Sequence, residues 1–253
     1  MPDLSGKTIL ITGAAGTVGQ ACLQAFRQAG AKVAMTDRAA PPPGALDQED
    51  VWFQSADVTD PGAVAAMFDA AVQRFGRIDG AVLAAGVEGA VGPIEEISEA
   101  DIDAVLAINL KGTLFPMQAC LRHMKAKGGG SIVALASISG VVGAASLAPY
   151  VISKHAIVGL VRTAALESGR HGVRVNAVCP GPIESAMMRR LDQALAARDP
   201  GRPAARPGEA PGVPLQRYAT ADEVAGMIAF LCSDAAGACH GGTYMVDGGF
   251  TAK

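Results

Sequence analysis

The chain has 253 residues, 50% of them apolar, which is ample material for the core of one domain spanning residues 1–253. A formal net charge of −3 and the lack of any Lys/Arg run exclude the electrostatic footprint of a protein that binds nucleic acid or anionic membranes. No uninterrupted apolar stretch reaches the roughly 18 residues of a membrane-spanning helix, and the first residues lack a signal-peptide layout, so we expect a cytoplasmic protein.

The cysteines are odd in number and scattered, with no C-x-x-C pair. This pattern is typical of reduced, buried thiols, and it predicts neither a disulfide framework nor a metal site. The excess of Arg over Lys, together with abundant Ala, indicates a GC-rich bacterial genome.

Short apolar runs alternate with longer amphipathic segments along the chain. The runs predict strands at residues 8–12, 32–36, 51–56, 80–84, 131–136, 173–178 and 243–246. Helical patterns fill most gaps, so the sequence predicts a single α/β domain with a doubly wound, Rossmann-type parallel sheet. Two segments interrupt the pattern: residues 39–50 predict an irregular connection, and the Pro/Gly-rich residues 199–214 predict a mobile loop.

The first predicted strand runs directly into a glycine turn and then a helix. Gly13, Gly16 and Gly19 would let the backbone approach a pyrophosphate, whose charge would lie on the amides at the helix start, at Thr17 and Val18. Close helix packing is the structural alternative for these glycines.

The ends of the next two strands carry acidic residues. Asp37 follows the glycine turn at the distance expected for a carboxylate that accepts hydrogen bonds from the hydroxyls of an adenosine ribose, which favours NAD over NADP. Arg38 tempers this preference because a guanidinium can pair with a 2′-phosphate. Asp57 and Val58 would hold the adenine edge, whereas a helix N-cap at Asp60 is the structural alternative for this acidic stretch.

Tyr150 and Lys154 stand four residues apart in a helical pattern, so their side chains share one helix face. A free tyrosine titrates near pH ~10, and we expect the ammonium to lower the pKa of Tyr150 toward neutrality. Together with Ser137 upstream, this pair predicts an acid/base site for the proton of an alcohol. The structural alternatives are a phenol packed in the core and a solvated lysine.

These residues stand in the order found in short-chain dehydrogenases/reductases, and the chain resembles the single-domain form of that family over its whole length. The resemblance also rests on Asn109, the Pro180-Gly181 pair after the sixth strand and the Asp247-Gly248-Gly249 run. It implies that Tyr150 donates or accepts a proton, that Ser137 binds the substrate oxygen and that Lys154 binds the nicotinamide ribose.

The resemblance assigns further roles. Asn109 would hold a water that links Lys154 to solvent; a helix-kinking asparagine is the structural alternative. The remaining cofactor contacts would come from Ala85, Gly86, Pro180, Gly181, Ile183 and Ser185.

Two departures from the family pattern stand out. Thr17 occupies the position where the single-domain form of the family usually has its second glycine. The resulting spacing of Gly13, Gly16 and Gly19 is similar to that of the sugar-nucleotide branch of the family. Leu83 and Ala84 replace two asparagines. Backbone contacts from Ala85 and Gly86 would remain.

We expect an NAD-dependent oxidoreductase that transfers a hydride between nicotinamide and a small, mostly apolar secondary alcohol or ketone, such as an alicyclic one. The expected substrate contacts are Glu88, Ser139, Leu147, Pro182 and Met187. A catalytically weak NAD-binding sensor or scaffold, suggested by the two departures, and a sugar-nucleotide epimerase or dehydratase, suggested by the glycine spacing, are the alternatives.

Residues 184–216 match the place of a substrate lid in the family, although a surface insertion without a role is the structural alternative. The resemblance also implies a homotetramer, assembled through two long helices at about residues 101–127 and 149–169 and through the C-terminal strand.

Overall fold

In the part of the chain that the structure describes, one sheet of seven parallel strands forms the centre of the molecule, in the order β3-β2-β1-β4-β5-β6-β7. The computed structural model describes residues 2–41, 44–46, 48–198, 210 and 212–252. The strands are β1 (Thr8–Thr12), β2 (Lys32–Thr36), β3 (Val51–Phe53), β4 (Gly80–Leu83), β5 (Gly130–Leu135), β6 (Val173–Pro180) and β7 (Thr243–Val246). The predicted parallel, doubly wound sheet is therefore confirmed.

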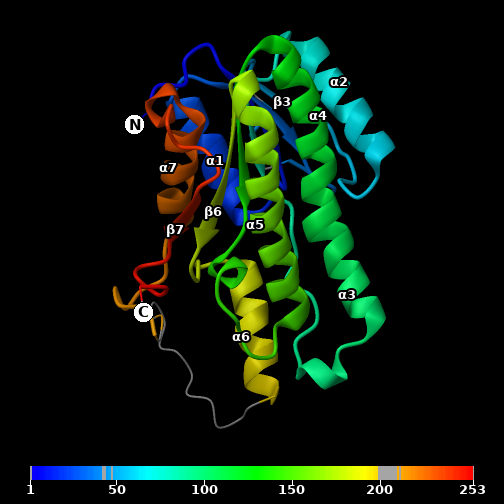
Figure 1. The fold of residues 1–253 in the computed structure, drawn as a ribbon, viewed down its shortest axis with the longest axis vertical. Helices are drawn as coiled ribbons and strands as arrows, with labels where there is room; N and C mark the ends of the chain where they lie inside the picture. The colour runs from blue at the N-terminus through cyan, green and yellow to red at the C-terminus, as the bar shows by residue number, and fades with distance from the viewer. Residues whose placement is uncertain (1, 42–43, 47, 199–209, 211, 253) are drawn as a thin grey trace.

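Helices cover both faces of this sheet. They are α1 (Thr17–Gln28), α2 (Pro61–Phe75), α3 (Glu99–Val105), α4 (Gly112–Lys127), α5 (Ala148–Ser168), α6 (Ala186–Arg198) and α7 (Ala221–Cys232). In Figure 1, α4 and α5 lie in front of the sheet, whereas α1 and α7 lie behind it. Each layer thus buries its own core against one face of the strands.

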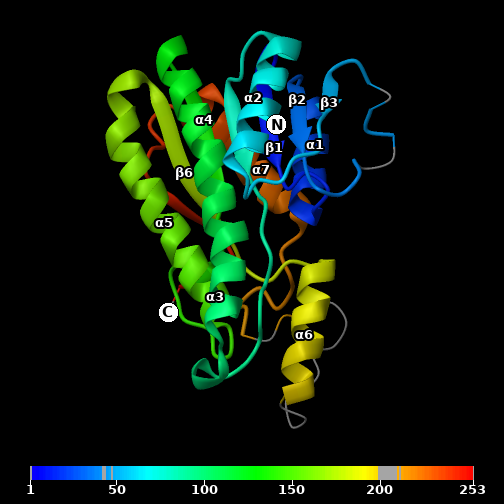
Figure 2. The same ribbon diagram turned by 90° about the vertical axis from the view of Figure 1, so that its right-hand side faces the viewer.

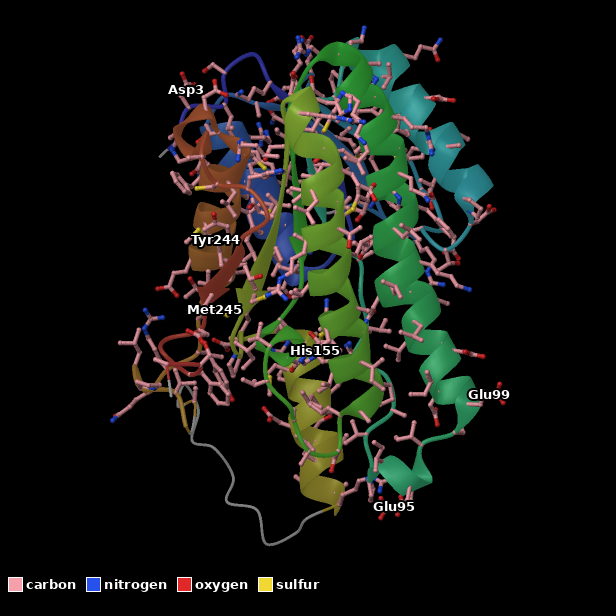
Figure 3. The ribbon with its side chains drawn as sticks, in the orientation of Figure 1. Asp3, Glu95, Glu99, His155, Tyr244 and Met245 are labelled. Carbon is pink, nitrogen blue, oxygen red and sulfur yellow. The ribbon has the colours of Figure 1, made fainter. Side chains whose placement is uncertain are left out.

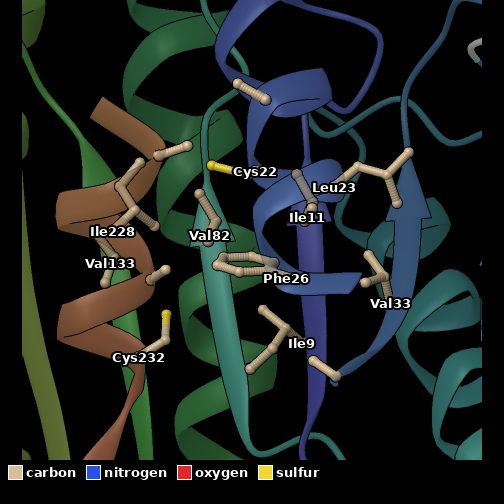
Figure 4. Close-up of a cluster of buried hydrophobic side chains, with 14 of the residues drawn as sticks. Ile9, Ile11, Cys22, Leu23, Phe26, Val33, Val82, Val133, Ile228 and Cys232 are labelled. Atoms are coloured by element: carbon tan, nitrogen blue, oxygen red, sulfur yellow. The ribbon is translucent and has the colours of Figure 1, made fainter. Parts of the chain in front are cut away.

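The core on the α1 side joins the start of the chain to its end. The Phe26 ring of α1 lies over Ile9 and Val82 of the sheet, beside Ile228 and Cys232 of α7 (Figure 4). Phe26, Ile9 and Ile228 are fully buried. Burying each such side chain stabilises the fold by about 1.5–3 kcal/mol.

The helix predicted at residues 101–127 is present but is not uniform. Ser98 and Asp101 form a capping box at the start of α3. Between α3 and α4, Leu106–Lys111 form a wider π-helical turn, and Pro116 stands inside α4. An 18-residue window of Glu99–Lys127 has a mean hydropathy of 1.3, which matches a membrane span by length and composition. Because 44% of the window is already buried inside this fold, the composition suits a core helix equally well.

Several element ends differ from those predicted. β3 ends at Phe53 instead of residue 56, because only the Gln54 amide continues the pairing, by donating to the Met35 carbonyl. β6 continues two residues further than predicted, to Pro180. The described part of residues 39–50 is irregular, as predicted.

The predicted lid at residues 184–216 is not a loop throughout, since its first part forms α6. Of the predicted mobile loop at residues 199–214, residues 199–209 and 211 lie outside the described part of the chain.

Candidate active site

The carboxyl ends of the parallel strands meet along one edge of the sheet, and the segments that leave them carry the predicted site residues. α6 stands beyond this edge, apart from the two helical layers (Figure 2). The strand ends approach each other closely here: a Cβ at Gly181, just after β6, would lie 2.8 Å from the Cα of Asp247, just after β7. Ligands of open α/β sheets bind at such an edge.

The glycine turn after β1 requires glycine for steric reasons. Gly13 has a φ of +68°, and a Cβ there would lie 2.6 Å from the Ala85 nitrogen. A Cβ at Gly19 would collide with the Gly13 carbonyl. The N-cap of α1 is Gly16, which has no side chain to accept from the first helical amides. Those amides, at Thr17 and Val18, are therefore placed to bind an anion.

A cleft of about 210 Å³ opens beside this turn. It is lined by Gly13, Gly16, Asp37, Arg38, Ala56, Asp57, Val58, Thr59, Ala84, Ala85, Gly86, Val87 and Ile108. Most of the residues predicted to hold the adenosine end of a dinucleotide are thus brought together, and the cradle of glycines fits such a group.

The acidic residues at this cleft have distinct partners. The Asp37 carboxylate accepts from the Ala15 amide at 3.0 Å and so ties the end of β2 to the glycine turn. The Arg38 guanidinium lies 3.8 Å from the Asp57 carboxylate. Hydrogen bonds from the Thr59 amide and hydroxyl hold the pKa of Asp57 below its usual value. Asp60 is the N-cap of α2, so the structural alternative applies to Asp60 and not to Asp57.

The structure brings Ser137, Tyr150 and Lys154 together. Ser137 follows β5, and its hydroxyl is hydrogen-bonded to the Tyr150 phenol in the first turn of α5. The Lys154 ammonium lies 5.5 Å from the centre of the Tyr150 ring and donates to the Leu135 carbonyl at 2.8 Å. Lys154 is only 4% exposed, so the alternative of a solvated lysine is wrong.

The expected lowering of the pKa of Tyr150 is wrong for the protein alone. Burial raises the pKa of Tyr150 to about 12; the Glu88 carboxylate and the Cys179 thiol add to this, and the hydrogen bond from Ser137 opposes it. Burial also lowers the pKa of Lys154 to about 8. The physical reason is that removal from water disfavours the charged form of both groups, which helical spacing alone does not reveal.

Asn109 lies fully buried in the π-helical turn and clamps the loop that follows β4. Its Oδ1 accepts from the Val87 amide at 2.8 Å, while its Nδ2 donates to the Val87 carbonyl at 2.9 Å and to the Ser153 hydroxyl at 3.0 Å. A Cβ at Gly86 would lie 3.3 Å from Asn109 Oδ1. Asn109 therefore positions the loop backbone next to Lys154, at a distorted point of the helix as the structural alternative predicts. Its role toward a water stays a prediction.

The predicted substrate contacts have mixed surroundings. Ser139 and Leu147 are buried, and the Ser139 amide donates to the Ser137 hydroxyl. The Pro182 carbonyl accepts a hydrogen bond from the Ala219 amide. The neighbouring Ile183 forms an isolated β-bridge with Ala219. The Ser185 hydroxyl accepts from the Met188 amide at the start of α6, the helix that carries Met187.

Glu88 forms a contact that sequence reasoning missed. Its carboxylate accepts from the Arg190 guanidinium at 2.5 and 3.2 Å, and a second pair joins Arg198 to Glu96 at 2.8 Å. Figure 3 shows Glu95, the neighbour of Glu96, at the far end of α6. Both pairs span 102 residues of sequence, so no local window contains a signal for them.

Comparisons with known proteins agree with this site. A family model described as enoyl-(acyl carrier protein) reductase matches residues 13–251. The chain is 36% identical to levodione reductase of Leifsonia aquatica, over 97% of this chain and 94% of that protein. It is 37% identical to D-threitol dehydrogenase of Mycolicibacterium smegmatis, over 99% and 95% of the two chains. It is 35% identical to cis-4-hydroxycyclohexanecarboxylate dehydrogenase of Sinomonas cyclohexanicum, over 97% of each.

The fold agrees as well. A crystal structure of levodione reductase superposes with a TM-score of 0.90 at 34% identity, covering 98% of each chain. These matches cover nearly the whole chain. They agree with a structure that brings Ser137, Tyr150 and Lys154 together beside a glycine-lined cleft. The chain belongs to the short-chain dehydrogenase/reductase family, and it is a nicotinamide-dependent oxidoreductase of alcohols and ketones.

Proposed function

We propose that this protein is an NAD-dependent dehydrogenase of small, mostly apolar secondary alcohols, alicyclic ones included, and that it reduces the matching ketones. The observation that carries the proposal is the grouping of Ser137, Tyr150 and Lys154 at the strand edge, next to the cleft after β1. The matched relatives are named for ketone or alcohol substrates, and one of these names contains a hydroxycyclohexane ring.

In this proposal the reacting oxygen lies between two hydroxyl groups. The Ser137 hydroxyl donates a hydrogen bond to it, while the Tyr150 oxygen takes the alcohol proton or returns it to the ketone. The Lys154 ammonium would hold the nicotinamide ribose, as Ile183 and Ser185 would hold the carboxamide end. Bound NAD would supply the hydride acceptor.

Two features support NAD over NADP. The Asp37 carboxylate stands at the end of β2 on the wall of the cleft, where it would accept from the ribose hydroxyls and repel a 2′-phosphate. The Arg38 guanidinium is directed to Asp57 at 3.8 Å, so it already has an anionic partner.

Absorbance of reduced nicotinamide across a panel of secondary alcohols, with NAD and NADP in parallel, tests the proposal. We expect turnover of compact alicyclic alcohols with NAD, and loss of nearly all turnover in Tyr150→Phe with NAD binding retained within a few fold, because only the ionisable oxygen is removed. A Tyr150→Phe enzyme that keeps more than roughly a tenth of kcat would overturn the assignment. NAD binding without turnover of any alcohol would favour the sensor or scaffold alternative.

We also propose that the protein is a cytoplasmic homotetramer. α5 supports this because it exposes Leu166, at 89%, and Ile152, at 44%, along a face that also contains Gly159, where a Cβ would meet nothing within 4 Å. An apolar helix face with room for close approach suits packing against a second copy of the same helix.

A further inference from the structure

The loop after β4 runs beside the start of α5. Three contacts define its course: Gly86, where a Cβ would lie 3.7 Å from Lys154 Nζ; Gly89, where a Cβ would lie 3.8 Å from Pro149 Cβ; and Gly92, whose amide donates to the Ser146 carbonyl at 2.9 Å. Glu88 falls between the first two contacts. Gly89 follows Glu88 and faces Pro149, which precedes Tyr150, so Glu88 and Tyr150 flank the same close contact.

The Glu88 carboxylate affects the chemistry of Tyr150. Its side chain is only 17% exposed, so water screens its charge weakly, and this charge contributes to the raised pKa of Tyr150. The other polar groups that act on the phenol or stand next to it are Ser137 after β5, Cys179 on β6 and Lys154 on α5. Glu88 is thus a negative charge beside the group that must become a phenolate to accept a proton.

Arg190 of α6 compensates this charge. Its Nε and Nη2 donate to the two carboxylate oxygens of Glu88, which is the fork geometry that arginine suits best. Burial of Glu88 opposes ionisation, but the contact with Arg190, together with a hydrogen bond from the backbone of Glu88 itself, holds the pKa of Glu88 below its usual value. Glu88 is consequently ionised at neutral pH, and Arg190 is its counterion.

We propose that Arg190 is a positioning residue for the reaction: it closes an ion pair on Glu88, offsets part of the negative charge beside Tyr150, and so helps Tyr150 to take the proton of the alcohol. The inference rests on the proposed role of Tyr150 as the acid/base group. No side chain of α6 is fully buried over its described length, although Met187, Leu191 and Leu195 are partly buried, so polar contacts such as this pair contribute to its attachment to the rest of the protein. The strength of the catalytic base is thereby coupled to the position of α6.

The chain contains a matched control for this idea. Arg198 of α6 pairs with Glu96 at 2.8 Å, across the same separation in sequence as the Glu88 pair. Glu96 is 55% exposed, and it is not among the groups that affect Tyr150. Loss of the Arg198 pair would loosen α6 to a similar extent without changing the charge at the phenol.

The test is the pH profile of kcat/KM for alcohol oxidation with NAD in four variants: Arg190→Gln, Glu88→Gln, the double variant and Arg198→Gln. Arg190→Gln leaves a bare carboxylate, so the acid limb should move to higher pH by about one unit, roughly a tenfold loss at a fixed pH on that limb. Adding Glu88→Gln removes the bare charge, so the double variant should return to the wild-type limb. Arg198→Gln should leave the limb in place.

Two results would overturn the inference: an unshifted limb in Arg190→Gln, or a shift that persists in the double variant. The second result would assign Arg190 only to the seating of α6. Because Arg190 is 59% exposed, its replacement is not expected to disturb the core.

A second readout needs no turnover. The tyrosinate absorbance of each variant, minus that of the same variant carrying Tyr150→Phe, follows the ionisation of Tyr150 alone. Glu88→Gln should ionise Tyr150 at lower pH than wild type, and an unchanged titration would overturn the inference. If instead Tyr150→Phe keeps its turnover in the wild-type background, the proposed function fails while this titration still reports on the charge effect.

Discussion

Lys154 is a buried cation at the centre of the site, and its environment favours chemistry over stability. It is 4% exposed, and its pKa is lowered from 10.5 to about 8 by burial. Near neutral pH the folded protein therefore holds a proton on Lys154 against the preference of its surroundings. Residues placed in this way commonly reduce the stability of the fold in exchange for activity.

Lys154→Met should accordingly raise the free energy of unfolding at pH 7, by about 2 kcal/mol, while it removes turnover and weakens cofactor binding. Between about pH 8 and pH 10.5, Lys154 binds a proton in the unfolded chain but not in the folded protein, so the wild type should gain stability relative to the variant as pH rises through that window. Denaturant unfolding of both proteins across this range measures the effect. A wild-type curve parallel to that of the variant would contradict it.

The proposed preference for NAD depends on the charge of Asp37. Asp37→Asn keeps an oxygen that can accept from the Ala15 amide but removes the charge, so the preference ratio should move toward NADP by about one to three kcal/mol. Parallel kcat/KM values for NAD and NADP measure the shift. Asp57→Asn, a carboxylate at the same cleft, is the control and should change the ratio less. A wild-type enzyme that already prefers NADP would refute the assigned role of Asp37.

The sequence predicts which residues form the site better than it predicts their pKa values. The grouping of Tyr150 and Lys154 follows from helical spacing, which is local and is therefore visible in the chain. Their pKa values depend on atoms contributed by other segments, such as Glu88 and Cys179. The same applies to Arg190, whose partner is remote in the sequence.

At the scale of elements, apolar periodicity predicts the strands and the long helices because burial is what creates that periodicity. It misses the π-helical turn at Leu106–Lys111, since one wide turn leaves the surrounding pattern intact. It also misses α6, whose apolar residues Met187, Leu191 and Leu195 share one face but are only partly buried, and which stands next to a Pro/Gly-rich segment.

The segment between α6 and α7 is expected to be accessible to proteases. Its Pro/Gly-rich sequence, in the family position of a substrate lid, predicts rapid cleavage between Arg198 and Arg217 by a protease of broad specificity in the protein alone, and slower cleavage with NAD plus a substrate analogue, because closure excludes water and protease together. Gel analysis over a time course measures both rates. Equal rates with and without ligands, combined with an unchanged kcat/KM after shortening the loop, would support an insertion without a role.

Assembly into the proposed tetramer would cover the exposed apolar face of α5. Leu166 is 89% exposed in a single copy and lies on the apolar face of α5. Leu166→Arg should split the proposed tetramer into smaller species, because it would bury a charge in the contact between copies. Light scattering at micromolar concentration checks this. Glu167→Arg, a change of charge at the neighbouring exposed position, is the control. A wild-type mass of 25.6 kDa, that of one chain, would contradict the tetramer itself.

The packing of α1 against α7 has a consequence for how the chain is made. Phe26 and the rest of the apolar face of α1 leave the ribosome early, whereas Ile228 and Cys232, which cover part of that face, belong to the C-terminal α-helix. Until α7 is synthesised, the first βαβ unit exposes apolar surface and is prone to aggregate. A chain that stops before residue 221 would contain Ser137, Tyr150 and Lys154, yet it would pellet instead of acting as a smaller enzyme.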